Sequence, residues 1–330
     1  MIDGSRQGTL SVGLARRQDG RGCQSTLDRL ARLHFEYQAR LALREKSATA
    51  YQDHFNDLME AVHGSDFIRV RPAGSAGDHK CDGYLQRTGT VFQVYAPVNV
   101  RIAKWLKKIA EDFTGAREQW TFMLAWTFVH NQHDGLPPDV AKAILQVKTD
   151  NPELTIEPWP PTRLLELSSN LSESRLTALF GQPPRDDDMR TLHRGDIAVA
   201  VAGLTREIAD WKPGTDLPKV DPRKLDYNNL SEYPSRLITA GIAQTSLVEG
   251  YFDNNPDPNL RDRAATRIKE AWRRIQPMAT SDDAFDHLYQ LVCEHAEGSR
   301  GMTAALALLA HLFEVCDIFE NPPSDWPGLA

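Results

Sequence analysis

The sequence predicts an α/β domain, with a mixed central sheet flanked by helices, followed by a mainly α-helical C-terminal domain. Short runs of β-branched and aromatic residues alternate with helical apolar spacings up to about residue 185, and helical spacings then continue almost without interruption after residue 222. The chain has 330 residues, of which 41% are hydrophobic and 25% charged, so its length and composition are those of a two-domain globular protein.

The elements of the first domain follow from these spacings in order. Apolar residues at helical intervals predict a helix from Leu27 to Tyr37 and a second from Phe55 to Val62, which ends at Gly64. Strands rich in β-branched and aromatic residues are expected next. The predicted strands are 67–71, 83–85, 91–95, 121–129 and 154–157, and the predicted helices among and after them are 102–113, 139–147, 161–167 and 172–180.

Composition divides the rest of the chain. Residues 1–24 are rich in Gly, Arg, Gln and Ser without apolar periodicity, which predicts a disordered lead-in. The α/β domain then spans 25–185, a helical linker 186–219 ends in a Pro-rich stretch, and a helical assembly domain spans 220–330. Its predicted helices are 230–251, 259–275, 281–295 and 302–319.

The chain has no stretch typical of a membrane or secreted protein. It contains no run of eighteen apolar residues and no secretory signal, so we expect a cytoplasmic protein without membrane contact. Its four cysteines lie far apart and form no CxxC pair, which favours reduced thiols over a zinc module.

Positive charge is concentrated in one segment. The net charge is −7, yet residues 67–108 carry eight basic and two acidic residues, which gives +6 there and leaves −13 for the rest. Such a segment either contacts nucleic acid or is a solvated face. The residues that we assign to DNA contact are Arg69, Arg71, Arg87, Arg101 and Lys107.

Two motifs lie inside this segment, GDHKCDGYL at 77–85 and TVFQVYAP at 90–97. Together they resemble the core of the Mrr-like branch of the PD-(D/E)xK nucleases, a restriction-endonuclease-like fold. The resemblance implies that Asp82 and Gln93 bind Mg²⁺, or Mn²⁺, through side-chain oxygens on adjacent strands, with the backbone carbonyl of Val94 as a third ligand. Hard cations of this kind require oxygen ligands.

A carboxylate from the preceding helix often joins such a site, which makes Glu60 a further candidate and Asp78 a second choice. The alternative is ordinary: Asp78 and Asp82 are turn residues beside glycines, and Glu60 is a solvated helix residue.

Tyr95 stands where the nuclease motif has its lysine. A phenol cannot supply the positive charge that stabilises the transition state of phosphoryl transfer. Either a lysine from elsewhere fills this role or the site is degenerate. The candidates are Lys108, then Lys104 four residues before it on the same predicted helix, and Lys80 in the loop before Asp82; plain solvent exposure explains the helix lysines equally well.

Further segments resemble the ABC three-component (Lamassu-like) anti-phage defence systems. The front half is similar in WTFVHN at 126–131 and LFG at 179–181, and the tail in KLDYNNLS at 224–231, GYF at 250–252 and FEVCDIFENP at 313–322. This resemblance implies an effector subunit that an SMC-like ATPase and a small middle subunit restrain until foreign DNA is detected.

The last predicted helix carries an apolar stripe, which is usually core. Its surplus of aromatic residues leads us to assign Phe313, Ile318 and Phe319 to a partner surface, through which the chain also self-associates. Two functions remain open: a Mg²⁺-dependent DNA endonuclease, or a catalytically degenerate DNA-binding or scaffold subunit of the same complex.

Overall fold

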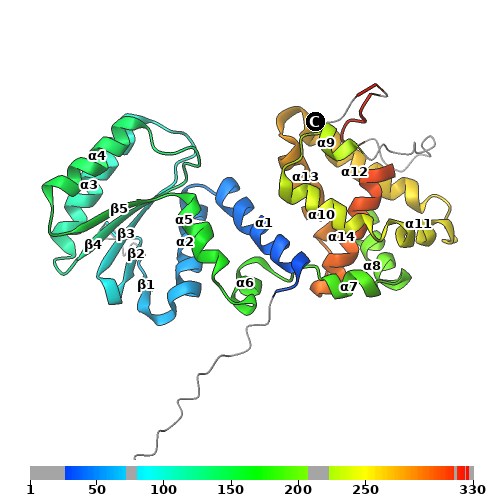
Figure 1. Cartoon of the computed structure of the whole chain (residues 1–330), viewed down its shortest axis with the longest axis horizontal. Coiled ribbons are helices and arrows are strands. Elements are labelled where there is room, and N and C mark those ends of the chain that lie inside the picture. Colours follow the sequence, from blue (N-terminus) through cyan, green and yellow to red (C-terminus); the bar gives the residue numbers. More distant parts are fainter. Residues whose placement is uncertain (1–26, 72–79, 207–222, 316–317, 324, 327–330) are drawn as a thin grey trace, which may run out of the picture.

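The computed structural model describes residues 27–71, 80–206, 223–315, 318–323 and 325–326. An α/β half and an all-helical half lie side by side, with the first helix between them (Figure 1). This agrees with the predicted order of a mixed sheet with helices followed by a mainly helical part. In the described ranges, no helix is long and apolar enough to cross a membrane.

Five strands form one mixed sheet in the order β1-β2-β3-β4-β5. The first three strands pair antiparallel and the last three parallel. A parallel pair requires a crossover connection, which α3 (Ile102–Gln119) and α4 (Pro138–Asp150) supply. The strands are β1 (Phe67–Arg69), β2 (Gly83–Leu85), β3 (Thr90–Tyr95), β4 (Ala125–His130) and β5 (Thr155–Trp159).

The strand predicted at 121–129 begins later, at Ala125. The Trp120 N–H donates to the carbonyl of Ala116 and ends α3, and the Met123 N–H donates to the carbonyl of Trp120 in a turn. The apolar residues before Ala125 are therefore used to connect the helix to the strand, which periodicity alone does not reveal.

Helices cover both faces of the sheet. Beneath α3 and α4 lies a core that includes Trp105, Trp126 and Phe128. The opposite face packs against α2 (Ala48–His63) and α5 (Pro161–Ser169). The helix α6 (Glu173–Phe180) follows α5. The core on that side includes Phe55, Phe67 and Phe92.

The helical half is built around α14 (Gly298–Val315). Every residue from Thr303 to Phe313 is buried, because this helix is apolar on all sides and other helices surround it. The segment predicted as one helix over 230–251 divides into two, α10 and α11, at Ala243 and Gln244. The remaining helices are α9 (Lys224–Tyr227), α10 (Glu232–Ile242), α11 (Thr245–Asp253), α12 (Leu260–Ile275) and α13 (Ser281–Cys293).

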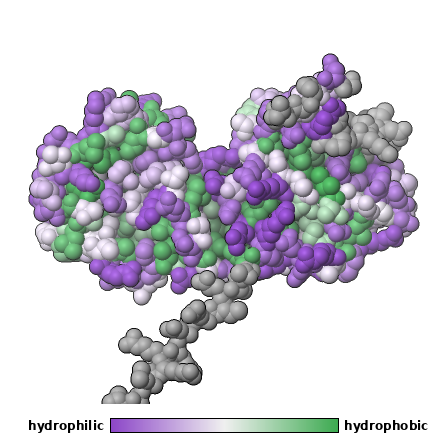
Figure 2. Space-filling model, viewed as in Figure 1, coloured by the Kyte–Doolittle hydropathy of each residue, from purple (hydrophilic) through white to green (hydrophobic). Residues whose placement is uncertain are grey.

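The first helix, α1 (Arg29–Glu45), is shared by the two halves. Leu33 and Tyr37 belong to the core of the helical half, whereas Phe35 and Leu43 belong to the core beneath α2. Its Arg44 forms an ion pair with Asp286 on α13. The α/β domain predicted to begin at residue 25 therefore starts with a helix that also contributes residues to the core of the helical half. Hydrophilic side chains cover much of the molecule where α1 lies (Figure 2).

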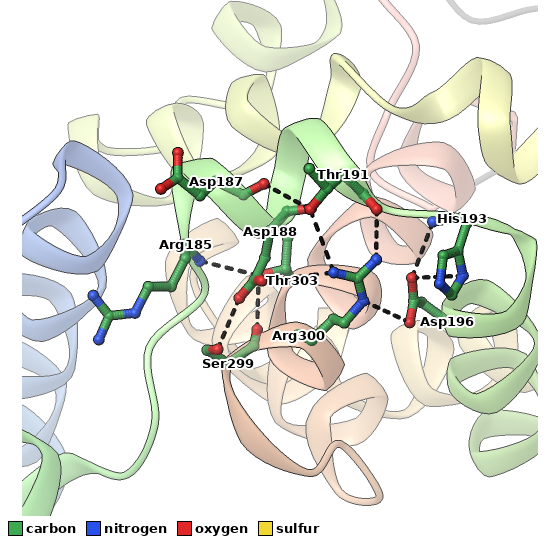
Figure 3. A network of polar contacts seen from close by, with 9 residues as sticks. All are labelled: Arg185, Asp187, Asp188, Thr191, His193, Asp196, Ser299, Arg300 and Thr303. Carbon is green, nitrogen blue, oxygen red and sulfur yellow. Dashed lines mark hydrogen bonds and ion pairs between the residues drawn. The ribbon is translucent and has the colours of Figure 1, made fainter.

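Residues 186–205, predicted as part of a linker, instead form α7 (Asp186–Thr191) and α8 (Arg194–Thr205) and join the helical core. A polar network connects them to the start of α14 (Figure 3). Arg300 donates to Asp196 on α8 and to Thr191 on α7, and Ser299 donates to Asp188. The predicted lead-in 1–24 and the Pro-rich stretch 212–222 lie outside the described residues.

Candidate functional site

The carboxylate of Asp82 is buried between the start of β2 and the edge of β3. It accepts hydrogen bonds from Gln52 Nε2 at 2.6 Å, from Gln93 Nε2 at 2.9 Å and from the Val94 N–H at 2.6 Å. Asp82 and Gln93 are in contact, through the amide nitrogen of Gln93 and not through its oxygen. The side chain of Asp82 is 3% exposed, so these polar partners replace the water that a carboxylate otherwise needs.

Local pairing explains this placement. The Asp82 N–H donates to the carbonyl of Phe92 at 2.8 Å, and Gly83 pairs with Phe92 in the strand register. Side chains alternate along β3, and those of Phe92 and Val94 belong to the core beneath α2. Gln93 and Tyr95 therefore point to the side on which α3 packs.

The atoms around Asp82 meet the ligand requirements of a hard cation only in part. Gln93 Oε1 is buried and has no hydrogen-bond partner among the described residues. Rotating the Gln93 amide would turn this oxygen toward the Asp82 carboxylate, where it would suit Mg²⁺. Over the same residues, no group of three His, Cys, Asp or Glu side chains is arranged to hold a metal. A cation would thus be held by Asp82 together with amide oxygens.

The helix contributes a different side chain from the one expected. Glu60 pairs with Arg69, whose Nε lies 2.9 Å from Glu60 Oε1, and its side chain is 48% exposed. The residue of α2 that contacts Asp82 is Gln52, two helical turns earlier. A glutamine in an amphipathic helix gives no sequence signal, so this contact could not be predicted. Asp78 lies outside the described residues, and the contact of Val94 with Asp82 is made by its N–H, not by its carbonyl.

Two of the three candidate lysines converge on one buried carboxylate, that of Asp112 on α3. Lys108 Nζ lies 2.6 Å from Asp112 Oδ2, and Lys80 Nζ lies 3.2 Å from Asp112 Oδ1. Lys108 Nζ also lies 5.9 Å from the centre of the Tyr95 ring. Lys104 is exposed and contributes no ion pair among the described residues.

These pairwise contacts connect the end of β3 with α3 and with the residues just before β2. Asp82 contacts Gln93, and Gln93 shares a strand face with Tyr95. Tyr95 lies beside Lys108, which pairs with Asp112. Asp112 pairs with Lys80, which lies two residues before Asp82. The structure therefore places Asp82 against Gln93 and Gln52, and Asp112 against Lys80 and Lys108. The sequence did not indicate the contacts of Gln52 and Asp112.

Several basic residues of the segment 67–108 pair with carboxylates, so less of its positive charge is uncompensated than the sequence suggests. Arg69 pairs with Asp57 and Glu60, Arg87 with Asp66 at 3.5 Å, and Lys107 with Glu111 at 3.6 Å. Arg71 and Arg101 are exposed. Nearby carboxylates, two of them from α2, offset part of the +6 that the segment carries in sequence.

The predicted partner residues lie in the core of the helical half. The exposed fractions of Phe313, Ile318 and Phe319 are 3%, 0% and 4%. The rings of Phe319 and Trp272 are 4.2 Å apart, and Lys224 Nζ donates to the carbonyl of Phe313 at 3.0 Å. Their assignment to a partner surface is wrong, because the chain itself folds back over α14 and covers them.

Residues 202–320 match the family model CTD10, described as C-terminal domain 10 of the ABC-three component (ABC-3C) systems. The helical half is therefore similar to a domain of these multi-component systems over most of its length. Comparison with curated proteins and with solved structures found no match for the chain.

Proposed function

We propose that this chain is the DNA-cleaving effector subunit of a bacterial ABC three-component defence complex. Two independent parts of the chain support this. The C-terminal domain is similar to a domain of those systems. The α/β half has the order helix, three antiparallel strands, helix, parallel strand, and it brings Asp82 and Gln93 together at the end of the sheet, as the motif implies.

The contact between Asp82 and Gln93 is the observation that carries the proposal. Asp82 would bind Mg²⁺ or Mn²⁺, with Gln93 and Gln52 contributing amide oxygens. The cation would polarise the scissile phosphate and lower the pKa of a bound water. Lys108 and Lys80 would provide the positive charge that Tyr95 cannot provide.

The proposed partners rest on the resemblance to the ABC three-component systems, which the match of the C-terminal domain supports. An SMC-like ATPase and a small middle subunit would restrain the effector until foreign DNA is detected, and the complex would act in the cytoplasm. The net charge of −7 supports this arrangement, because a protein of that charge binds DNA weakly at physiological salt unless it is tethered. Tethering to the ATPase, or self-association on activation, makes further DNA contacts intramolecular.

One observation favours a second function, a degenerate nuclease-like DNA-binding or scaffold subunit. Three uncharged donors already satisfy the Asp82 carboxylate, and Tyr95 occupies the position of the motif lysine. In this case the polar contacts around Asp82 would be a structural remnant, and no cation would bind there.

Cleavage of supercoiled plasmid separates the two functions. We expect the full chain, alone or with its partner subunits, to nick or linearise plasmid in Mg²⁺ or Mn²⁺ but not in EDTA. The isosteric change Asp82→Asn should abolish cleavage, and Asp139→Asn, at an exposed aspartate on α4, should not. Folded Asp82→Asn protein that cleaves at the normal rate, or no cleavage by the activated complex, would rule out the nuclease.

A further inference from the structure

The carboxylate of Asp112 is buried beneath two lysines. Its side chain is 1% exposed, and ammonium groups lie close to both of its oxygens. These contacts are ion pairs without regular hydrogen-bond geometry, and no other donor hydrogen-bonds to either oxygen among the described residues. A carboxylate buried in this way requires opposite charges, so its stability depends on Lys80 and Lys108.

The position of Lys80 depends on a glycine. Lys80 has a φ of +59°, in the left-handed region that side chains other than glycine rarely adopt. Its side chain crosses α3 at Gly115, where a Cβ would lie 2.6 Å from Lys80 Cγ. Glycine within a helix lowers helix stability relative to alanine. The chain carries a glycine at the one point where the Lys80 side chain crosses the helix.

Both lysine side chains are partly exposed. The Lys80 and Lys108 side chains are 43% and 34% exposed, above a carboxylate that is almost completely buried. The three residues together carry a charge of +1. Two lysines repel each other, and the carboxylate beneath them offsets this repulsion while holding both side chains in place.

We infer that Lys80 and Lys108 form a preorganised binding site for a backbone phosphate of nucleic acid, and that Asp112 is its positioning residue. Phosphate fits the site because lysine binds it as a point charge without a fixed angle. Fixing both side chains in advance reduces the conformational entropy that is lost on binding. The inference rests on the proposed function only in taking nucleic acid as the source of the phosphate.

Binding of a short DNA duplex to the full chain in EDTA tests this site without cleavage. Fluorescence anisotropy at several low salt concentrations gives the affinity and its salt dependence. We expect Lys80→Ala and Lys108→Ala each to reduce the slope of log affinity against log salt, and the double variant to reduce it by about 0.9, the value for one phosphate contact. Lys142→Ala is the matched control, because Lys142 lies on the neighbouring helix α4 and pairs with the exposed Asp139 instead.

Asp112→Asn separates positioning from simple charge. The change removes a negative charge, so a role in charge balance alone predicts equal or tighter DNA binding and an unchanged cleavage rate. A positioning role instead predicts weaker binding in EDTA despite the lost negative charge, because the two lysine side chains are no longer fixed in advance, together with a loss of kcat of tenfold or more. A shift of the lysine signals in an NMR spectrum of the ammonium groups would report the loss of the fixed pair even in a chain that never cleaves.

The outcomes separate this inference from the proposed nuclease. Lysine-dependent binding without cleavage by the activated complex would retain the phosphate site and reject the nuclease. An effect of Lys142→Ala as large as those of Lys80→Ala and Lys108→Ala would show general electrostatic attraction and overturn the site. So would an unaltered chain that binds no duplex at low salt.

Discussion

The side-chain amide of Gln52 on α2 donates to Asp82 Oδ1 at 2.6 Å. This hydrogen bond connects the helix to the end of the sheet where β2 begins. A glutamine at this position provides a donor when no cation is bound and an amide oxygen when one is. A glutamate would provide only acceptors, which gives the contact a direct test.

Gln52→Glu should make the stability of the chain depend on metal. In EDTA, two carboxylates would face each other in a largely buried site, and we expect a loss of about 1–3 kcal/mol in the free energy of unfolding. Mg²⁺ should restore it, as measured by urea unfolding with and without the ion. The control is Gln146→Glu, since Gln146 makes the same kind of contact with Asp150 at an exposed site. Equal responses of the two variants to Mg²⁺ would contradict a cation site at Asp82.

Gly115→Ala should stabilise the chain less than a comparable change elsewhere. Alanine raises helix propensity, but its Cβ would displace Lys80 from the buried Asp112. In Gly250→Ala on α11, the nearest side-chain atom would lie 3.9 Å from the new Cβ, and we expect a gain of about 0.5–1 kcal/mol. Urea midpoints compare the two variants. If Gly115→Ala is stabilised to the same extent, Lys80 does not depend on the glycine.

Phe319→Ala should unfold or strongly destabilise the helical half instead of weakening a surface contact. The ring packs against Trp272 and Phe313, so its loss should cost about 3–5 kcal/mol. Met278→Ala, at a residue that is 85% exposed, should change stability by less than about 0.5 kcal/mol. Both are measured by urea unfolding followed by circular dichroism. A Phe319→Ala chain that has normal stability but no longer assembles would show that Phe319 does belong to a partner surface.

The stability of the chain should fall in mild acid, in part because of His34. Burial lowers the pKa of His34 on α1 to about 4 from 6.5, so between these values the unfolded chain binds a proton that the folded chain excludes. Stability from this group is complete above pH 6.5 and declines toward pH 4, by up to about 1.4 kcal/mol per pH unit. His34→Gln keeps an acceptor for the Tyr289 hydroxyl, which lies 3.3 Å from His34 Nδ1. Its unfolding free energy, measured at pH 7.5 and pH 5, should therefore change less than that of the unaltered chain; an equal change would show that His34 does not titrate on unfolding.

Local patterns predicted most of the elements, because strands and helices differ in the period of their apolar residues. The strands at 83–85 and 91–95 and the helices at 259–275 and 281–295 lie close to their predicted bounds. The Asp82 and Gln93 contact was also predictable, since a motif on two adjacent strands brings its residues together. The predictions were wrong in two places. Apolar residues before Ala125 form a turn instead of the start of β4, and α1 packs in the cores of both halves instead of in the α/β domain alone.

Residue patterns alone predicted the order of an α/β half and a helical half, the motif that contains Asp82, Gln93 and Tyr95, and the similarity of the tail to a domain of the ABC-three component systems. Only the tertiary structure decided that Phe313, Ile318 and Phe319 are core, that Glu60 turns to Arg69 while Gln52 meets Asp82, and that Asp112 holds two of the three candidate lysines. The physical reason is that periodicity reports which face of an element avoids water, whereas burial by the chain's own later segments and pairing of charges depend on contacts between residues distant in sequence. Lys80 and Asp112 are such a pair, because a carboxylate on a helix acquires a function only when the fold places a cation over it.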